Sequence, residues 1–114
     1  MKKVNIGIIG FGTIGSGVVK AIKERSALLR DTCGIDIHIA RICDKDLTSK
    51  RPVKVSKKLL TRSVTKILYN PSIDIVVELM GGVDPARDIV LEALRHGKHV
   101  VDRKSTRLNS SHRL

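Results

Sequence analysis

Aromatic side chains are almost missing from this chain, since only Phe11 and Tyr69 occur among its 114 residues. Phe11 lies inside a glycine-rich segment, so the sequence lacks the stacked aromatic platforms that bind single-stranded nucleic acid. The formal net charge is nevertheless +11, with Lys and Arg dense between residues 45 and 66. We interpret most of this charge as solvated surface and expect no nucleic-acid partner. A basic nucleic-acid-binding protein is the alternative hypothesis.

Cysteine and long apolar runs are also scarce. Cys33 and Cys43 are spaced neither as a C-x-x-C pair nor as a zinc site with histidines, which predicts reduced cysteines in a cytoplasmic protein. The histidines at positions 38, 96 and 99 form no recognisable ligand set, so we expect no metal site. No run approaches the roughly 20 apolar residues that cross a membrane, and we expect no membrane partner.

The sequence does contain a G-x-G-x-x-G pattern, Gly10-Phe11-Gly12-Thr13-Ile14-Gly15. It follows the apolar, β-branched residues 4–9 and precedes a helical pattern, the order of a strand, a tight turn and a helix. In such a turn Gly10 allows the sharp bend, Gly12 lets a pyrophosphate approach the backbone, and Gly15 lets the helix pack closely. We therefore predict a dinucleotide site here, the alternative being a glycine-rich turn that only packs.

Two other phosphate or nucleophile motifs are excluded by residue type. Gly12 and Gly17 have the spacing of a P-loop, but Val18 and Val19 stand where Lys and Ser or Thr are required. Ser16 cannot form a nucleophile elbow, because the flanking glycines of a G-x-S-x-G are missing.

The apolar segments alternate between strand and helix patterns along the chain, which predicts a parallel sheet covered on both faces. Strands are expected over residues 3–9, 36–42 and 73–79 and from His99 onward, with a short edge strand near 60–62. Helices are expected over residues 13–30 and 64–69, and between a cap at Asp84 and a stop at Gly97. A short helical turn is expected from a cap at Ser56 through Leu60. The predicted fold class is α/β, a Rossmann-type doubly wound parallel sheet that is incomplete.

An acidic residue at the end of the second strand binds the adenosine ribose in such folds. Asp44 stands at that end, whereas Asp36 has the better spacing from the glycines but begins the strand. We favour Asp44, with a turn-capping role as the alternative. Arg41, Lys45 and Lys50 are close enough in sequence to reach a 2′-phosphate, so the cofactor is expected to be NADP or NAD, without a choice between them.

The segment Glu78-Leu79-Met80-Gly81-Gly82 follows the buried third strand. Ligands bind outside the carboxyl ends of parallel strands, near the point where the strand order reverses. We therefore include Met80, Gly81 and Gly82 in the cofactor site, where the glycine pair would let the backbone approach the ribose or nicotinamide. A plain turn, with Glu78 ion-paired, is the alternative.

Together these segments resemble the N-terminal NAD(P)-binding domain of homoserine dehydrogenase. The resemblance is carried by residues 6–15, 41–47, 73–82 followed by Pro85-Ala86-Arg87, and 97–101. It implies an oxidoreductase that interconverts L-homoserine and L-aspartate 4-semialdehyde with NADPH or NADH, on the route to threonine and methionine. It also implies that Phe11, Thr13 and Ile14 contact the cofactor along with the glycines, and that the full-length parent is a homo-oligomer.

From Asp102 to His112 the chain departs from the family and resembles a translated sequencing adapter. We therefore expect a dinucleotide-binding domain over residues 1–101 and a non-native tail over 102–114, the competing interpretation being a basic terminal arm. The cofactor-contacting lysine of the family falls at Ser105, and Lys104 is one position away. The family's substrate domain is not matched, so we name no catalytic residue and expect the chain alone to be inactive. A non-catalytic dinucleotide-sensing module is a further alternative.

Overall fold

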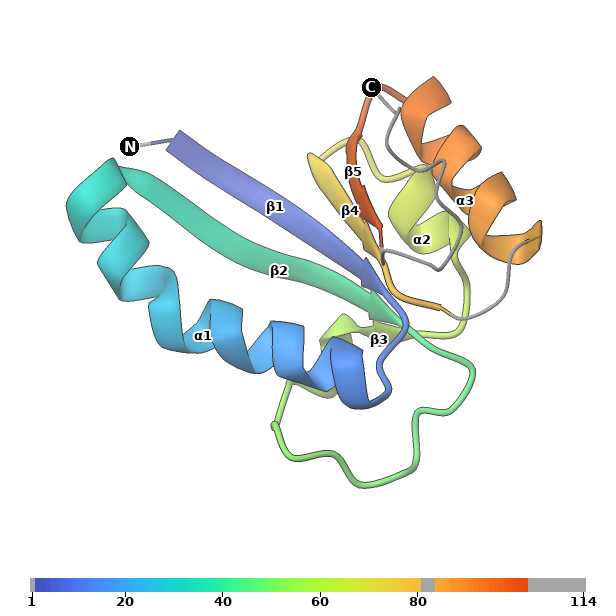
Figure 1. The fold of residues 1–114 in the computed structure, drawn as a ribbon, viewed down its shortest axis with the longest axis horizontal. Helices are drawn as coiled ribbons and strands as arrows, with labels where there is room; N and C mark the ends of the chain where they lie inside the picture. Colours follow the sequence, from blue (N-terminus) through green and yellow to red (C-terminus); the bar gives the residue numbers. More distant parts are fainter. Residues whose placement is uncertain (1, 81–83, 103–114) are drawn as a thin grey trace.

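The fold is known from a computed structural model that describes residues 2–80 and 84–102 (Figure 1). Its five strands form one parallel sheet in the order β3-β2-β1-β4-β5. The strands are β1 (Lys2–Ile9), β2 (Ile35–Cys43), β3 (Leu60–Thr61), β4 (Ile75–Glu78) and β5 (His99–Asp102). The helices are α1 (Thr13–Cys33), the 3₁₀ turn η1 (Lys57–Leu59), α2 (Thr65–Leu68) and α3 (Asp84–Arg95). The predicted α/β, Rossmann-type class is therefore confirmed.

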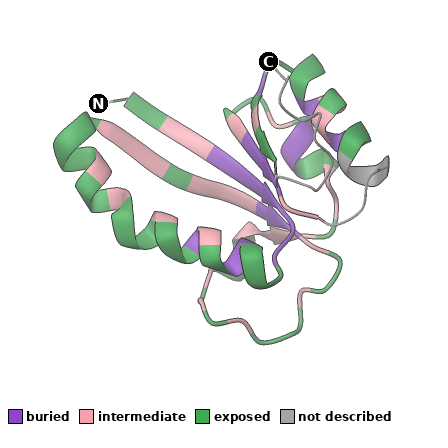
Figure 2. Ribbon diagram, viewed as in Figure 1, coloured by how far each residue is buried: buried purple, intermediate pink, exposed green. Residues whose placement is uncertain are grey.

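The sheet carries helices on both faces, with α1 on one and α2 and α3 on the other (Figure 1). Successive side chains of a strand point to opposite faces, so Ile8 packs with Val19 of α1 while Ile9 packs with Ile67 and Ile89. This is why the carboxyl half of β1 and most of β4 are continuously apolar. Figure 2 shows that the buried residues of β1, β2 and β4 lie toward the carboxyl ends of these strands.

Helix α1 is longer than the sequence pattern predicts, because it continues past Arg30 to Cys33. Gly34 ends it in the left-handed conformation, with φ +69°, and donates its N–H to the carbonyl of Arg30 at 3.2 Å. Such a cap is typical of glycine. Only Gly15, Ser16 and Val19 of this helix are buried, so its second half lies exposed along β2 (Figure 2).

The shorter elements agree with the prediction in type and differ slightly in extent. Strand β4 begins at Ile75 rather than residue 73, because the N–H of Ile73 bonds back to the carbonyl of Asn70 and closes a turn. The Ser56 hydroxyl accepts the N–H of Lys58 at 3.3 Å and caps η1. Helix α3 begins at Asp84 itself, and the turn predicted at residues 81–82 lies outside the described residues. Over the described chain, no helix is both long and apolar enough to span a membrane.

Candidate functional site at the carboxyl edge of the sheet

The carboxyl ends of β1, β2 and β4 meet at one edge of the sheet. The N–H of Gly10 donates to the carbonyl of Cys43 at the end of β2, at 2.7 Å, and the N–H of Leu79 donates to the carbonyl of Ile9, also at 2.7 Å. The chain order reverses between β1 and β4, since β2 lies on one side of β1 and β4 on the other. Ligands of open α/β sheets bind at such a switch point.

The three glycines of the turn differ in what surrounds them. Gly10 has φ +109°, and a Cβ there would lie 2.9 Å from the backbone of Leu79. A Cβ on Gly15 would lie 2.0 Å from the Gly10 carbonyl oxygen, so only glycine allows α1 to pack this closely on the turn. A Cβ on Gly12 would meet no described atom within 4 Å. Gly10 and Gly15 are thus required by the fold, whereas Gly12 faces open space.

The first turn of α1 presents backbone N–H groups at this edge. The first bond within the helix runs from the N–H of Ser16 to the Gly12 carbonyl, at 2.8 Å. In the described structure no side chain caps this end and no acidic residue stands in the first turn. Thr13 and Ile14 are exposed, Ile14 by 45% despite its apolar side chain. Uncapped N–H groups with the positive end of the helix dipole suit a phosphate.

Asp44 lies beside the glycine turn, whereas Asp36 does not. The Asp44 carboxylate accepts the N–H of Phe11 at 2.5 Å through Oδ2 and that of Asp46 at 2.9 Å through Oδ1. Asp36 stands at the opposite, amino end of β2, 2.8 Å from the Nε2 of His38. That hydrogen bond holds the pKa of Asp36 below its usual value. Of the two candidates, the structure therefore brings only Asp44 to the site.

The resemblance implies that Phe11 contacts the cofactor, but the side chain of Phe11 does not reach the surface. It is 2% exposed and belongs to the core formed with Ile8, Val19 and Ile42. Its backbone is held at the edge, with the N–H on Asp44. A cofactor contact through the ring would require the core to open.

The end of β4 forms the other wall of the edge. Glu78 is 2% exposed, and its Oε2 accepts the N–H of Met80 at 2.8 Å. Met80 is half-buried and packs on the core that α2 and α3 share with the sheet. Gly81 and Gly82, which the sequence also places in the site, lie outside the described residues.

One residue at this edge was missed by the sequence analysis. Arg51 donates Nε–H to the carbonyl of Phe11 at 2.6 Å, and its guanidinium carbon lies 4.7 Å from the centre of the Phe11 ring. The basic residues chosen from sequence are placed differently: Arg41 donates to the carbonyl of Lys58, at 3.2 Å. No local pattern distinguishes Arg51 from its basic neighbours, because its partners come from a distant turn.

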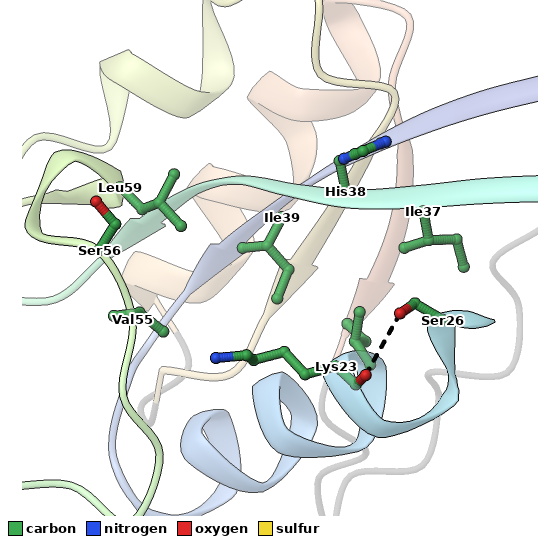
Figure 3. A pocket seen from close by; sticks show the side chains of 9 residues that line it. Lys23, Ser26, Ile37, His38, Ile39, Val55, Ser56 and Leu59 are labelled. Carbon is green, nitrogen blue, oxygen red and sulfur yellow. Dashed lines mark hydrogen bonds between the residues drawn. The ribbon is translucent and has the colours of Figure 1, made fainter.

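A hollow lies away from this edge, between α1, the middle of β2 and residues 55–59 (Figure 3). Its volume is about 240 Å³, and it is lined mainly by apolar side chains, among them Ile22, Ile37, Ile39, Val55 and Leu59. Lys23 at its rim donates to the carbonyl of Lys54 at 2.7 Å. The segment that joins β2 to β3 on this side is a loop with the single turn η1.

Metal and thiol chemistry find no support in the described residues. These contain no cluster of three or more His, Cys, Asp or Glu able to hold a metal ion. Both cysteines are free thiols, with Cys33 exposed and Cys43 buried. Burial raises the pKa of the Cys43 thiol, and the charge of Asp44 adds to this, which disfavours a reactive thiolate.

Comparison with known proteins agrees with this geometry. The family described as the NAD-binding domain of homoserine dehydrogenase matches residues 10–108. Homoserine dehydrogenase of Bacillus subtilis is 40% identical over 101 residues, which are 89% of this chain and 23% of that protein. The crystal structure of S. aureus homoserine dehydrogenase at pH 8.5 superposes with a TM-score of 0.87 at 44% identity, over 95% of this chain and 27% of the other.

A more distant homoserine dehydrogenase, from Thiobacillus denitrificans, has a TM-score of 0.76 at 33% identity and is covered over 23% of its chain. The chain thus spans about a quarter of the length of the relatives it matches. The matched part is a nucleotide-binding domain, which gives the cofactor class as a nicotinamide dinucleotide. On the family match and the shared fold, this chain belongs to the homoserine dehydrogenase NAD-binding domain family.

Proposed function

We propose that this chain binds NADP or NAD at the carboxyl edge, with the pyrophosphate over Gly12 and the first turn of α1. The observation that carries the proposal is the open space at Gly12, beside a helix end that no described side chain caps. A pyrophosphate needs close approach to the backbone and donors aimed at it, and this turn offers both. Gly10 belongs to the same turn, and Thr13, Ile14 and Gly15 form the start of α1.

Asp44 is the proposed ligand of the adenosine ribose. Each of its carboxylate oxygens accepts one backbone N–H, and each retains a further lone pair for a hydroxyl group. Met80 follows β4, which lies across the switch point from β2, so we propose that it contacts the nicotinamide half of the cofactor. The sequence pattern adds Gly81 and Gly82 to this part of the proposed site.

For the full-length parent we propose the activity of homoserine dehydrogenase, hydride transfer between L-homoserine and L-aspartate 4-semialdehyde in threonine and methionine biosynthesis. In this proposal the described residues bind and orient the dinucleotide, and the parent assembles as a homo-oligomer. We assign no catalytic residue to the described part of the chain. The nicotinamide cofactor would carry the hydride, and the small-molecule substrate would bind elsewhere in the parent.

A pair of glycine variants tests the cofactor site. We expect Gly12→Val to raise the dissociation constant for NADPH by at least about tenfold, since the side chain occupies the pyrophosphate position. Gly12 has φ −85°, outside the left-handed region that favours glycine, and a Cβ there meets no described atom within 4 Å, so the melting temperature should change little. Gly17→Val is the matched control, because a Cβ there also meets no described atom within 4 Å. Titration of NADPH and NADH fluorescence gives the affinities, and equal affinities for wild type and Gly12→Val would overturn the proposed site.

A further inference from the structure

We propose that Arg51 is a positioning residue of the dinucleotide site, which fixes the glycine turn through Phe11 and acts equally on NAD and NADP. This inference rests on the proposed function, and it assigns Arg51 a role other than binding a 2′-phosphate. It follows from a set of contacts that we call the Phe11 clasp. Its members are Phe11, Asp44, Asp46, Ser49 and Arg51.

The guanidinium of Arg51 is engaged on three backbone carbonyls. Nε–H donates to Phe11 at 2.6 Å, Nη1–H donates to Ser49 at 2.8 Å, and Nη2–H donates to Asp46. The same group lies over the Phe11 ring, 4.7 Å from its centre. A planar fork of fixed donors can bind several acceptors at once, which a lysine ammonium on a flexible stem cannot reproduce.

Phe11 is held from both sides of its backbone. Its N–H donates to Asp44, and its carbonyl accepts from Arg51. Asp44 in turn accepts the N–H of Asp46, whose carbonyl accepts from Arg51. The contacts therefore form a closed ring that ties the loop after β2 to the turn after β1.

This ring controls the orientation of the next peptide unit. In a planar trans peptide the carbonyl of residue 11 and the N–H of Gly12 point in opposite directions. With the Phe11 carbonyl anchored on Arg51, the Gly12 N–H is aimed away from the clasp. Since Gly12 is the glycine of the G-x-G-x-x-G turn with open space around it, the clasp presets the part of the backbone that meets the pyrophosphate. The pyrophosphate is common to NAD and NADP, so both cofactors depend on the clasp alike.

The test compares Arg51→Ala and Arg51→Lys with the matched variant Arg62→Ala. Arg62 also donates Nε–H to a loop carbonyl, that of Lys45 at 3.1 Å, and its removal loses the same charge outside the clasp. Dissociation constants for NADH and NADPH are measured on the 114-residue chain, with the folded fraction checked by circular dichroism. Arg51→Lys retains the charge and provides the measurement if Arg51→Ala fails to fold.

We expect each Arg51 variant to raise the dissociation constants for NADH and for NADPH by about tenfold, because charge-assisted hydrogen bonds are lost. The ratio of the two affinities should stay unchanged. Arg62→Ala should leave both affinities within about twofold of wild type, the tolerance expected of an exposed site. A loss confined to NADPH would overturn the proposal and make Arg51 a ligand of the 2′-phosphate. Unchanged affinities in both Arg51 variants would overturn it as well. Equal affinities of wild type and Gly12→Val would refute the proposed cofactor site itself. Weaker binding by Gly12→Val together with unchanged binding by the Arg51 variants would refute only the role of the clasp.

Discussion

The two edges of the sheet satisfy their backbone polar groups in different ways. At the amino edge, side chains from one segment bind the backbone of another: the Lys98 ammonium donates to the carbonyls of Asn70 and Ile73, at 2.6 and 2.8 Å. Asp74 likewise accepts the N–H of Asn5 at 2.8 Å. At the carboxyl edge, the first turn of α1 has no side-chain cap in the described structure.

The difference separates a structural edge from the edge at which we propose that the dinucleotide binds. Buried backbone groups that lack a partner are costly, so a fold pairs them or leaves them open to solvent and ligands. Lys98 is only 6% exposed and completes the pairing at the amino edge. The turn around Gly12 is left open, while Gly10 and Gly15 hold it tightly against β4 and α1. Variants at the two edges should therefore separate stability from cofactor affinity.

The largest effect is expected from Gly15→Ala, which breaks the tight part of the carboxyl edge. Its Cβ would stand 2.0 Å from the Gly10 oxygen, a backbone atom that cannot rotate away. We expect a loss of about 3 kcal/mol or more in the free energy of unfolding, through overpacking. Urea denaturation followed by circular dichroism measures it, with Gly17→Ala as the control. A Gly15→Ala chain as stable as wild type would contradict the close helix–turn contact.

A smaller loss is expected from Lys98→Ala, which breaks the amino edge. The carbonyls of Asn70 and Ile73 would lose a charged donor in a buried place, at a cost of about 2 kcal/mol. Dinucleotide affinity of the folded chain should not change, because Lys98 lies at the edge opposite the glycine turn. Parallel measurement of urea midpoints and NADPH titrations checks both statements. Weaker dinucleotide binding by a fully folded Lys98→Ala chain would contradict the separation of stability and binding between the two edges.

The smallest effect concerns the loop of the carboxyl edge and its response to acid. Hydrogen bonds from the Ser49 hydroxyl, then from the backbone and hydroxyl groups of Thr48 and Ser49, hold the pKa of Asp46 well below its usual value. A lowered carboxyl pKa stabilises the fold above the unfolded value of about 3.9, and that contribution is lost as pH falls further.

We therefore expect Asp46→Asn to be less stable than wild type at pH 6, and the difference in the free energy of unfolding to become smaller as the pH falls toward 2. The exposed Asp31→Asn removes the same charge from α1 and serves as the control. Unfolding curves at both pH values give the comparison. A constant difference between Asp46→Asn and wild type across this range would contradict a role for the ionised carboxylate.

Much of the fold could be predicted from sequence, because its causes are local. The apolar run before Gly10 and the helical spacing after Thr13 predicted β1 and the start of α1. The end of α1 was predicted too early. The helix continues through the residues after Arg30, because no helix-ending residue occurs before Gly34. The fragment of strand β3, with two residues, was also anticipated near its observed place.

The site was predicted less completely, because its parts lie far apart in the chain. The position of Asp44 followed from the strand pattern, but its bond to Phe11 spans 33 residues. The bond from Arg51 to Phe11 spans 40 residues and crosses a loop without a readable pattern. Nothing in the sequence separates Arg51 from Lys45 or Lys50 as the basic residue that reaches the turn.

The sequence by itself determined the glycine turn, the alternation of strands and helices, and the family, since each depends on steric and apolar patterns within short segments. Only the tertiary structure decided that Gly12 is open while Gly15 is enclosed, that Phe11 is a core residue, and that Arg51 anchors its carbonyl. These outcomes require the ends of β1, β2 and β4 to meet. Loop closure brings those ends together, and its geometry depends on the packing of the whole sheet.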